Sequence, residues 1–498
     1  MTDMPQQDPL RSGNGEPFPT TVVKEVALAS ASQPAWASRK LKDRLRLLRA
    51  LRQSIVHNAE ALVEAVETGR PRQSGETLAS EVLPLVESIR FLERRASRIL
   101  APRAHRRRYF PVWLAGVSLE ILREPFGVIL VIGPSNYPLF LPGVQIVQAL
   151  AAGNAVVVKP GTTGLPVMSL LRDLAERSGF DAGVLRVLDE SALSAEAAIA
   201  AGVDKVVLTG SAVTGRKVLG LLSDGLTPST MELSGCDATF VCPDADLELV
   251  TKALCFGMRL NAGATCIAPH RVFVPQALAS DLETRLVEAL RPVGSLEVAC
   301  AVAERAQSLV NEAVAAGAVL LCGEIQPGKS FRPVVLANAT SGMRLLAEDV
   351  FAPVVTVIHV DDMAEAIRLD EECPYALGAS VFGRKRSARR IARQINAGTI
   401  VINDMITPMA HPALPFGGRA ESGFGITRGA EGLLEMTQVK AVAVRRGKWR
   451  PHLDPARAED EAFLRYYLMA SRGKGFWCRL KAGVAMLKAI ARRTRGTA

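Results

Sequence analysis

Paired cysteines are missing from this chain. Its eight cysteines include no C-x-x-C pair, and none of them has the spacing of zinc ligands. The chain begins with an acidic, polar and proline-rich stretch, without the basic and then apolar segments that mark a signal peptide. We therefore expect a cytoplasmic protein with free thiols and no metal site, and a disordered lead-in over residues 1–20.

An unbroken membrane-spanning segment is missing as well. The longest uncharged run, residues 126–158, is long enough to cross a bilayer. Three prolines (Pro134, Pro138 and Pro142) and the pair Gly153–Asn154 interrupt it. The run therefore predicts a buried strand, a loop, a helix and a second strand rather than a transmembrane helix.

Most of the chain has little excess charge of either sign. The net charge is +10, and residues 441–498 alone carry fourteen Lys or Arg against four Asp or Glu, which is again +10. The first 440 residues are therefore close to neutral. This distribution argues against a nucleic-acid-binding protein and indicates one local basic segment.

The composition is that of a soluble globular protein with a large core. Its 498 residues are 48% hydrophobic and 22% charged, which allows two or more domains. Short apolar runs alternate with helical patterns, and this order is typical of a doubly wound parallel sheet. We expect strands at residues 127–132, 155–158, 184–188 and 205–208, with helices at 142–152, 165–178 and 193–201 between them.

Ligands of such sheets bind beyond the carboxyl ends of the strands. Here those ends are the polar or glycine-rich stretches 133–136, 159–162 and 209–211. A second alternating region runs from about residue 238 to 430, with strands expected at 271–274, 353–358 and 398–402. We expect a ligand pocket where the two regions meet.

Two residues near that junction have the chemistry of a covalent catalyst. Cys266 is a candidate nucleophile, because a thiolate attacks a carbonyl and later leaves from a thioester. Glu232 is a candidate base that would activate water for the second half of such a cycle. Taken alone the pair is weak evidence, because cysteine is usually a small buried apolar residue.

The usual dinucleotide fingerprint G-x-G-x-x-G is absent. The nearest pattern is Gly210-Ser-Ala-Val-Thr-Gly215, which would hold a pyrophosphate at a helix start or be an ordinary serine-capped helix. Lys159 would contact a ribose or phosphate, or be a solvated lysine at a strand end. Asn136 would donate to an oxyanion, or be a turn asparagine.

Seven motifs in order carry a resemblance that none carries alone. They are Pro-Ser-Asn-Tyr-Pro (134–138), Gly-Asn-Ala-Val-Val-Val-Lys-Pro (153–160), Leu-Thr-Gly-Ser (208–211), Glu-Leu-Ser-Gly (232–235), Gly-Ala-Thr-Cys (263–266), Glu-Asp-Val-Phe-Ala-Pro (348–353) and Pro-Phe-Gly-Gly…Ser-Gly-Phe-Gly (415–425). Over roughly residues 25–445 the chain resembles the aldehyde dehydrogenase superfamily. Asn-Tyr-Pro and Cys-Ile-Ala-Pro are most similar to its class-3, or fatty aldehyde, branch.

The resemblance implies an α/β fold with two doubly wound parallel-sheet domains. It implies an atypical Rossmann domain for NAD or NADP over residues 21–235, with an oligomerisation hairpin near 105–125. A catalytic domain over 236–430 follows, and then a return to the oligomerisation sheet over 431–447. A homodimer is what the class-3 branch suggests.

The resemblance also implies a role for each motif residue. Cys266 would attack the aldehyde, Asn136 and the Cys266 N–H would stabilise the oxyanion, and Glu232 would activate the hydrolytic water. Hydride would pass to the nicotinamide between these steps. The implied cofactor-binding residues are Ser135, Lys159, Thr162, Gly210, Ser211, Thr214, Leu233, Glu348 and Phe351.

Three departures from the family pattern affect the cofactor and the pocket. Thr162 stands where the family often has a glutamate that bonds a ribose hydroxyl, so a repulsion against NADP is absent. Glu-Leu-Gly-Gly-Lys becomes Glu-Leu-Ser-Gly-Cys, with Ser234 and Cys236 new. Phe-Gly-Pro becomes Phe-Ala-Pro at 351–353. None of these changes removes a catalytic group.

The segment 448–498 is a basic tail with the apolar spacing of an amphipathic helix. Trp477, Leu480, Val484, Leu487 and Ala491 share the helical spacing. Residues 460–498 would lie on an anionic membrane surface, or would pack on a partner subunit or remain solvated. The arginine cluster 103–108 would add to a membrane face, and a lipophilic aldehyde, long-chain or carotenoid-derived, would then be a natural substrate.

Two other functions stay open at this point. A CoA-acylating enzyme would resolve the thioester with CoA, although Glu232 counts against it. A catalytically silent member would serve as a binding or structural protein.

Overall fold

The protein is described by a computed structural model that covers residues 19–69, 72–104, 114, 116–325, 330–447, 450–453, 455 and 457–495. The chain forms two compact units, one made of residues 1–103 and 121–441 and the other of residues 104–120 and 442–498. The predicted lead-in lies outside the described residues except for residues 19 and 20. Most of the arginine cluster 103–108 also lies outside them.

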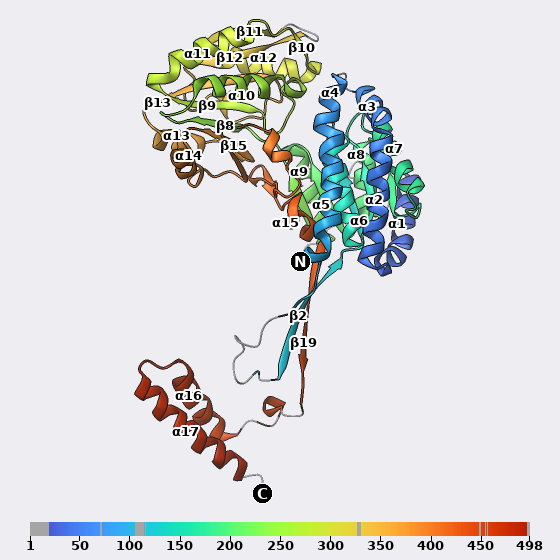
Figure 1. Cartoon of the computed structure of the whole chain (residues 1–498), viewed down its shortest axis with the longest axis vertical. Helices are drawn as coiled ribbons and strands as arrows, with labels where there is room; N and C mark the ends of the chain where they lie inside the picture. The colour runs from blue at the N-terminus through green and yellow to red at the C-terminus, as the bar shows by residue number, and fades with distance from the viewer. Residues whose placement is uncertain are drawn as a thin grey trace, which may run out of the picture. The chain divides into compact units, whose positions relative to one another are not determined.

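The larger unit is built around two large sheets, and Figure 1 labels many of the helices that pack on them. The first sheet has the strand order β18-β7-β6-β3-β4-β5. Its strands are β3 (Val128–Ile132), β4 (Ala155–Lys159), β5 (Leu185–Val187), β6 (Lys205–Thr209), β7 (Ser229–Glu232) and β18 (Gly423–Phe424). All pairs are parallel except β18 with β7. The predicted strands of this region are confirmed, and most of their apolar residues are buried, as expected for a sheet covered on both faces.

Helices cover both faces of this sheet because alternate residues of each strand point to opposite sides. Ile129 and Val131 pack with α2, α5, α6 and α7, whereas Val128 and Leu130 pack with α1, α8 and α9. The helices of this region are α1 (Thr20–Ser38), α2 (Leu41–His57), α3 (Ala59–Glu67), α4 (Ser74–Thr77), the π-helical η1 (Leu78–Val82), α5 (Leu83–Ile99), α6 (Phe140–Ala152), α7 (Leu165–Arg177), α8 (Ala192–Ala200) and α9 (Ala212–Leu222).

A second sheet of the same unit has the order β10-β12-β13-β9-β8-β15-β16, with β11 paired to β12. Its strands are β8 (Asp237–Val241), β9 (Pro269–Pro275), β10 (Leu296–Glu297), β11 (Val319–Ile325), β12 (Ser330–Ala337), β13 (Val354–Val360), β15 (Gly378–Phe382) and β16 (Thr399–Ile402). Strands β10 and β11 are antiparallel to β12, and the other pairs are parallel. The predicted fold with two doubly wound sheets is confirmed.

Helices also pack on both sides of the second sheet. Residues of α10 and α11 form a core with one set of strand residues, and residues of α13 and α14 form a core with the other. The remaining elements are α10 (Leu247–Arg259), the 3₁₀-helical η4 (Leu260–Gly263), α11 (Gln276–Leu290), α12 (Cys300–Ala315), η5 (Arg344–Leu346), α13 (Met363–Asp370), β14 (Tyr375–Ala376), α14 (Lys385–Ala392), η6 (Thr407–Ala410), β17 (Arg419–Ala420) and α15 (Gly429–Glu435).

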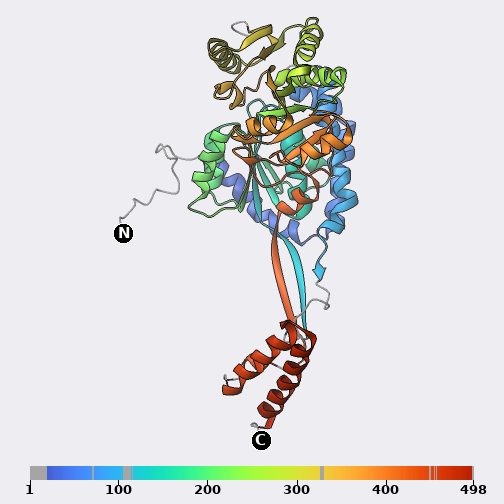
Figure 2. The same cartoon turned by 90° about the vertical axis from the view of Figure 1, so that its left-hand side faces the viewer.

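A separate three-stranded sheet has the order β1-β2-β19, formed by β1 (Arg103–Ala104), β2 (Val117–Pro125) and β19 (Thr437–Arg445). Its predicted role in oligomerisation stays a prediction. In the smaller unit, η7 (Pro451–Leu453) precedes α16 (Ala458–Arg472) and α17 (Phe476–Arg495), which lie side by side (Figure 2). The helix predicted from Trp477 onward is confirmed. No helix in the described part of the chain is long and apolar enough to span a bilayer.

Candidate active site

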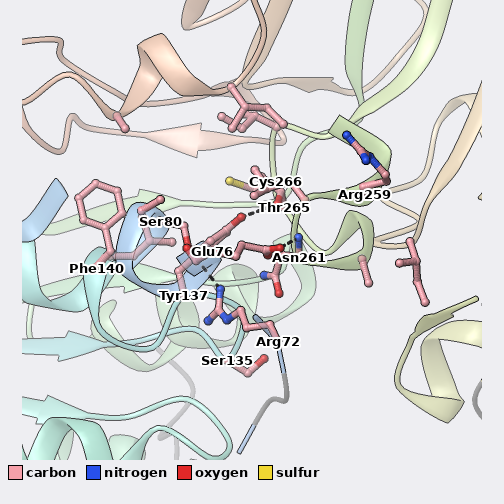
Figure 3. A pocket seen from close by; sticks show the side chains of 18 of the residues that line it. Arg72, Glu76, Ser80, Ser135, Tyr137, Phe140, Arg259, Asn261, Thr265 and Cys266 are labelled. Atoms are coloured by element: carbon pink, nitrogen blue, oxygen red, sulfur yellow. Dashed lines mark hydrogen bonds between the residues drawn. The ribbon is translucent and has the colours of Figure 1, made fainter. Parts of the chain in front are cut away.

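A cavity of about 1300 Å³ brings Cys266 and Glu232 together. Glu232 ends β7 of the first sheet, whereas Cys266 lies between η4 and β9, a strand of the second sheet. Ser135 and Thr162, both predicted to bind the cofactor, line the same cavity. The close view in Figure 3 places Cys266 among side chains from several loops and helix ends.

An unusual turn delivers Cys266 to the cavity. Asn261, Ala262 and Gly263 all have positive φ, at 50°, 51° and 73°. Such left-handed conformations are uncommon for residues other than glycine and occur often at functional sites. A Cβ atom at Gly263 would lie 2.5 Å from the carbonyl carbon of Ala352, so glycine is required there. The Asn261 side-chain amide donates to the Ala264 carbonyl at 3.1 Å and stabilises the turn.

The residues around Cys266 are held from two further directions. The hydroxyls of Tyr137 and Thr265 form a hydrogen bond of 2.6 Å (Figure 3). On another side, a Cβ atom at Gly235 would lie 2.3 Å from the Cys266 carbonyl oxygen. The segment that follows Glu232 therefore packs directly on the backbone of Cys266, and this contact couples the positions of the two candidate catalytic residues.

Burial dominates the electrostatics of both residues. Burial raises the pKa of the Cys266 thiol well above its ordinary value, the charges of Glu232, Asp237 and Asp349 raise it further, and Arg428 opposes them. Burial also raises the pKa of the Glu232 carboxyl, and Arg428 and a hydrogen bond from Thr427 oppose that rise. A carboxyl with a raised pKa is suited to accept a proton near neutral pH.

Glu232 has one oxygen available for chemistry. Its Oε2 accepts a hydrogen bond of 3.3 Å from the Thr427 hydroxyl. Among the described residues, none forms a hydrogen bond with its buried Oε1. Because an unpartnered buried oxygen is costly, its presence beside a candidate nucleophile is typical of a functional carboxylate.

Asn136 lies against the same turn as Cys266. It is buried, and its Nδ2 donates to the Ala264 carbonyl at 3.1 Å. In turn its own carbonyl accepts a hydrogen bond of 3.0 Å from the Asn261 amide. The Asn136 side-chain amide is thus held against the carbonyl of Ala264, two residues before Cys266 in the chain. Its role toward an oxyanion stays a prediction.

The remaining predicted cofactor residues lie mainly at the carboxyl ends of the first sheet. Lys159 ends β4, where burial lowers the pKa of its ammonium and Glu190 and Asp189 oppose that shift. Gly210 and Ser211 precede α9, and the Ser211 hydroxyl accepts a hydrogen bond of 3.1 Å from the Thr214 N–H. Leu233 packs beside α9, because a Cβ atom at Gly215 would lie 2.8 Å from it.

These residues fit a dinucleotide. The side chains of Ser135, Thr162, Ser211 and Thr214 are exposed at this edge of the sheet, where Lys159 supplies a cation and α9 begins. Hydroxyl groups, a cation and a helix N-terminus are the donors that ribose and pyrophosphate groups need. Among the described residues, no group of three or more His, Cys, Asp or Glu side chains is placed to hold a metal ion.

Glu348 and Phe351 are not among the residues that line the cavity. The Glu348 carboxylate is ion-paired with Arg305 and, at 2.9 Å, with Arg344. Phe351 has a φ of 53°, and its N–H donates to Asp349 Oδ1 at 3.1 Å. Their predicted contacts with the cofactor stay predictions.

Sequence reasoning missed three side chains of the site. Tyr137 was part of a motif but received no role. Arg72 forms a 2.6 Å ion pair with the buried Glu81 on η1. The other carboxylate oxygen of Glu81 accepts hydrogen bonds of 3.0 and 2.7 Å from the N–H groups of Leu139 and Phe140. Arg428 lines the cavity, although nothing in the local pattern marks it. Neither Arg72 nor Glu81 was marked by a motif, because Arg72 precedes α4 and Glu81 lies in the π-helical η1.

Comparison with known proteins gives one family. The model of the aldehyde dehydrogenase family matches residues 19–442. Betaine aldehyde dehydrogenase of Cereibacter sphaeroides is 34% identical over 450 residues, covering 86% of this chain and 90% of that protein. The 4,4'-diapolycopene aldehyde oxidase of Methylomonas sp is 31% identical over 430 residues, covering 84% and 81%.

A solved structure gives the same result. The NADP-dependent glyceraldehyde-3-phosphate dehydrogenase of Bacillus halodurans C-125, complexed with NADP, superposes with a TM-score of 0.79 and 27% identity. The match covers 86% of this chain and 91% of that one. These names do not single out the class-3 branch, so that narrower assignment stays a prediction.

Proposed function

Because the chain belongs to the aldehyde dehydrogenase family, we propose that it oxidises a hydrophobic aldehyde to the carboxylic acid at Cys266 and Glu232. The observation that carries this proposal is the shared cavity, in which a thiol and a buried carboxylate with one unpartnered oxygen lie together. NAD or NADP would supply the hydride acceptor, and Ser135, Lys159, Thr162, Ser211 and Thr214 at the carboxyl ends of the first sheet would hold it.

The chain's own residues perform the rest of the cycle. The Cys266 thiolate forms a bond to the aldehyde carbon, and the resulting oxyanion accepts hydrogen bonds from Asn136 and the Cys266 N–H. Loss of hydride from that carbon leaves a thioester on Cys266. Glu232 then removes a proton from water, whose oxygen attacks the thioester and displaces the Cys266 sulfur. The acid leaves, Cys266 is again a thiolate, and Glu232 releases the proton to solvent, so that both side chains return to their initial states.

The walls of the cavity support a lipophilic substrate. Apolar side chains line much of it, including Phe140, Leu141, Phe256, Ile267 and Phe416. Burying apolar surface gives roughly 25 cal/mol per Å², so a longer hydrocarbon chain gains binding energy along such walls. The relative named for 4,4'-diapolycopene aldehyde supports the same substrate class.

A panel of short, aromatic, long-chain and carotenoid-derived aldehydes, each with NAD and with NADP, tests the proposal. We expect absorbance of the reduced nicotinamide to appear with the acid as product, and kcat/KM to rise with chain length. Both cofactors should be accepted, because Thr162 places no carboxylate against a 2′-phosphate. Cofactor reduction only in the presence of CoA, with an acyl-CoA as the product, would contradict hydrolysis by Glu232, and no turnover at all would contradict oxidation.

We further propose that the helices α16 and α17 bind an anionic membrane surface. Large apolar side chains of α17 are exposed, with Phe476 and Trp477 each 71% and Leu487 62% accessible. Lysines on the same helix, Lys481 and Lys488, are also exposed. A helix with exposed apolar and basic residues is suited to lie in the headgroup region of an anionic bilayer. Location in the cytoplasm and assembly as a homodimer stay predictions beside this one.

Vesicle sedimentation should show this binding directly. The full chain should bind vesicles that contain phosphatidylglycerol, and deletion of residues 460–498 should abolish the binding. The triple variant Lys474→Gln, Lys481→Gln, Lys488→Gln should bind roughly a hundredfold more weakly, because each basic residue contributes about 1 kcal/mol near an anionic surface. Vesicles of phosphatidylcholine alone serve as the control. Equal binding by the truncated and full chains would contradict the proposal.

A further inference from the structure

Arg428 is a buried cation at the cavity that holds Cys266 and Glu232. Its guanidinium carbon lies 4.3 Å from the ring centroid of Phe416 and 5.7 Å from that of Phe140. Its Nη1 donates to the Met409 carbonyl, whereas its buried Nε has no hydrogen-bond partner in the part of the chain that the structure describes. A charge held in this way is costly unless nearby negative groups balance it.

The backbone of Arg428 is strained as well. The residue stands immediately before α15 with a φ of 62° and a ψ of 173°. That combination is essentially restricted to glycine, and residues held there by the surrounding structure cluster at functional sites. Two independent features, a buried partly unpaired guanidinium and an unfavourable backbone conformation, therefore meet at this one residue.

Neighbouring contacts attach Arg428 to both candidate catalytic residues. Phe416 and Met409, which the guanidinium contacts, belong to the apolar cluster against which Cys266 packs. Thr427, the preceding residue, donates to Glu232 Oε2 and exchanges backbone hydrogen bonds of 2.8 and 2.7 Å with Phe416. Arg428 and Glu232 form no direct ion pair. The positive charge of Arg428 therefore acts on the Cys266 thiol and the Glu232 carboxyl across the cavity, and its guanidinium leaves Oε1 of Glu232 unbonded.

We propose that Arg428 is a positioning residue for the oxidation, whose buried positive charge stabilises the Cys266 thiolate and the ionised Glu232 carboxylate. The inference rests on the proposed function, because both groups must become negative in that cycle. Glu232 as an anion disfavours the thiolate beside it, since like charges at one site repel. A single cation that faces the same cavity stabilises the thiolate and the carboxylate together.

The other charged groups that face Cys266 all act in the opposite direction. They are Glu232, Asp237 and Asp349, and burial raises the pKa of Asp349 to about 7. Tyr137 is the remaining titratable neighbour, and burial raises the pKa of its phenol, so it stays neutral near pH 7. Arg428 is thus the charge that lowers the pKa of both the thiol and the Glu232 carboxyl.

The test is the pH dependence of Cys266 alkylation by iodoacetamide, measured by mass spectrometry of the Cys266 peptide without cofactor or aldehyde. Wild type, Arg428→Lys and the neutral variants Arg428→Gln and Arg428→Met are compared. We expect the neutral variants to shift the midpoint upward by about one pH unit, which is roughly a tenfold loss of rate below the midpoint. Arg428→Lys should restore most of the wild-type profile.

Two other cysteines provide controls in the same samples. Exposed Cys478 on α17 should be alkylated to the same extent in wild type and every variant, whereas buried Cys255 should remain unmodified as long as the variant is folded. Equal midpoints for wild type and a folded neutral variant, or equal shifts for Lys and Gln, would overturn the proposal. If aldehyde oxidation depends on Cys266 but the alkylation profile of the neutral variants is unchanged, the role of Arg428 is refuted and the proposed function stands. If the profile shifts but no aldehyde is oxidised, the proposed function is refuted and the role of Arg428 stands.

Discussion

Replacement of Cys266 by alanine is expected to lower aldehyde oxidation on the order of 10⁴-fold or more, because the variant lacks the atom that bonds to the substrate. Binding of NAD or NADP, measured by fluorescence titration, should change little, since the residues proposed for the dinucleotide lie mainly at the carboxyl ends of the first sheet. The measurement is steady-state formation of the reduced cofactor with the best aldehyde of the panel.

A matched thiol control separates this effect from the loss of any cysteine. Cys478 is exposed on α17, and Cys478→Ala should retain wild-type kcat/KM. Appreciable turnover by Cys266→Ala, with the same aldehyde dependence as wild type, would remove Cys266 from the nucleophile's role.

Replacement of Glu232 by glutamine should stop the cycle at the thioester. The first turnover should still reduce one cofactor per active site, because bond formation to Cys266 and hydride loss do not need the carboxylate. Hydrolysis should slow by about 10²–10⁴-fold, which is the range for loss of a general base. Stopped-flow absorbance should therefore show a burst of reduced cofactor followed by a slow steady state.

The pH dependence of wild type gives an independent measure of the same base. Because burial raises the pKa of Glu232, hydrolysis should increase with pH through a value above that of an ordinary glutamate, and Glu232→Gln should lose this limb. Glu288→Gln removes an exposed carboxylate of α11 and is the matched control. An unchanged steady-state rate in Glu232→Gln would show that another group activates the water.

Local patterns were sufficient for most of the fold. The apolar runs 127–132 and 155–158 became β3 and β4, because a strand buried on both faces needs an unbroken apolar sequence. Gly153, with a φ of 103°, ends α6 where the Gly-Asn pair predicted an end. The ordered motifs indicated that Cys266 and Glu232 belong to one site, and in the structure both side chains line the same cavity.

Features that depend on distant contacts were not accessible in this way. The charge of Arg428 matters because residues 416 and 409 fold around it, and no spacing in its own segment shows that. Glu348 is the glutamate of the 348–353 motif, yet in the structure its carboxylate is ion-paired with Arg305 and Arg344. Likewise the partner of Glu81 comes from across a π-helical turn, a geometry that short helical patterns do not predict.

Mass spectrometry of the trapped intermediate tests the proposed chemistry most directly. Glu232→Gln is mixed with a long-chain aldehyde and the preferred cofactor, quenched within the burst, and mapped by peptide mass. We predict an acyl group on the Cys266 peptide, which increases the peptide mass by the mass of the aldehyde less two hydrogens. Reduced cofactor without any acyl group on Cys266, or an acyl group on one of the other cysteines, would contradict the account.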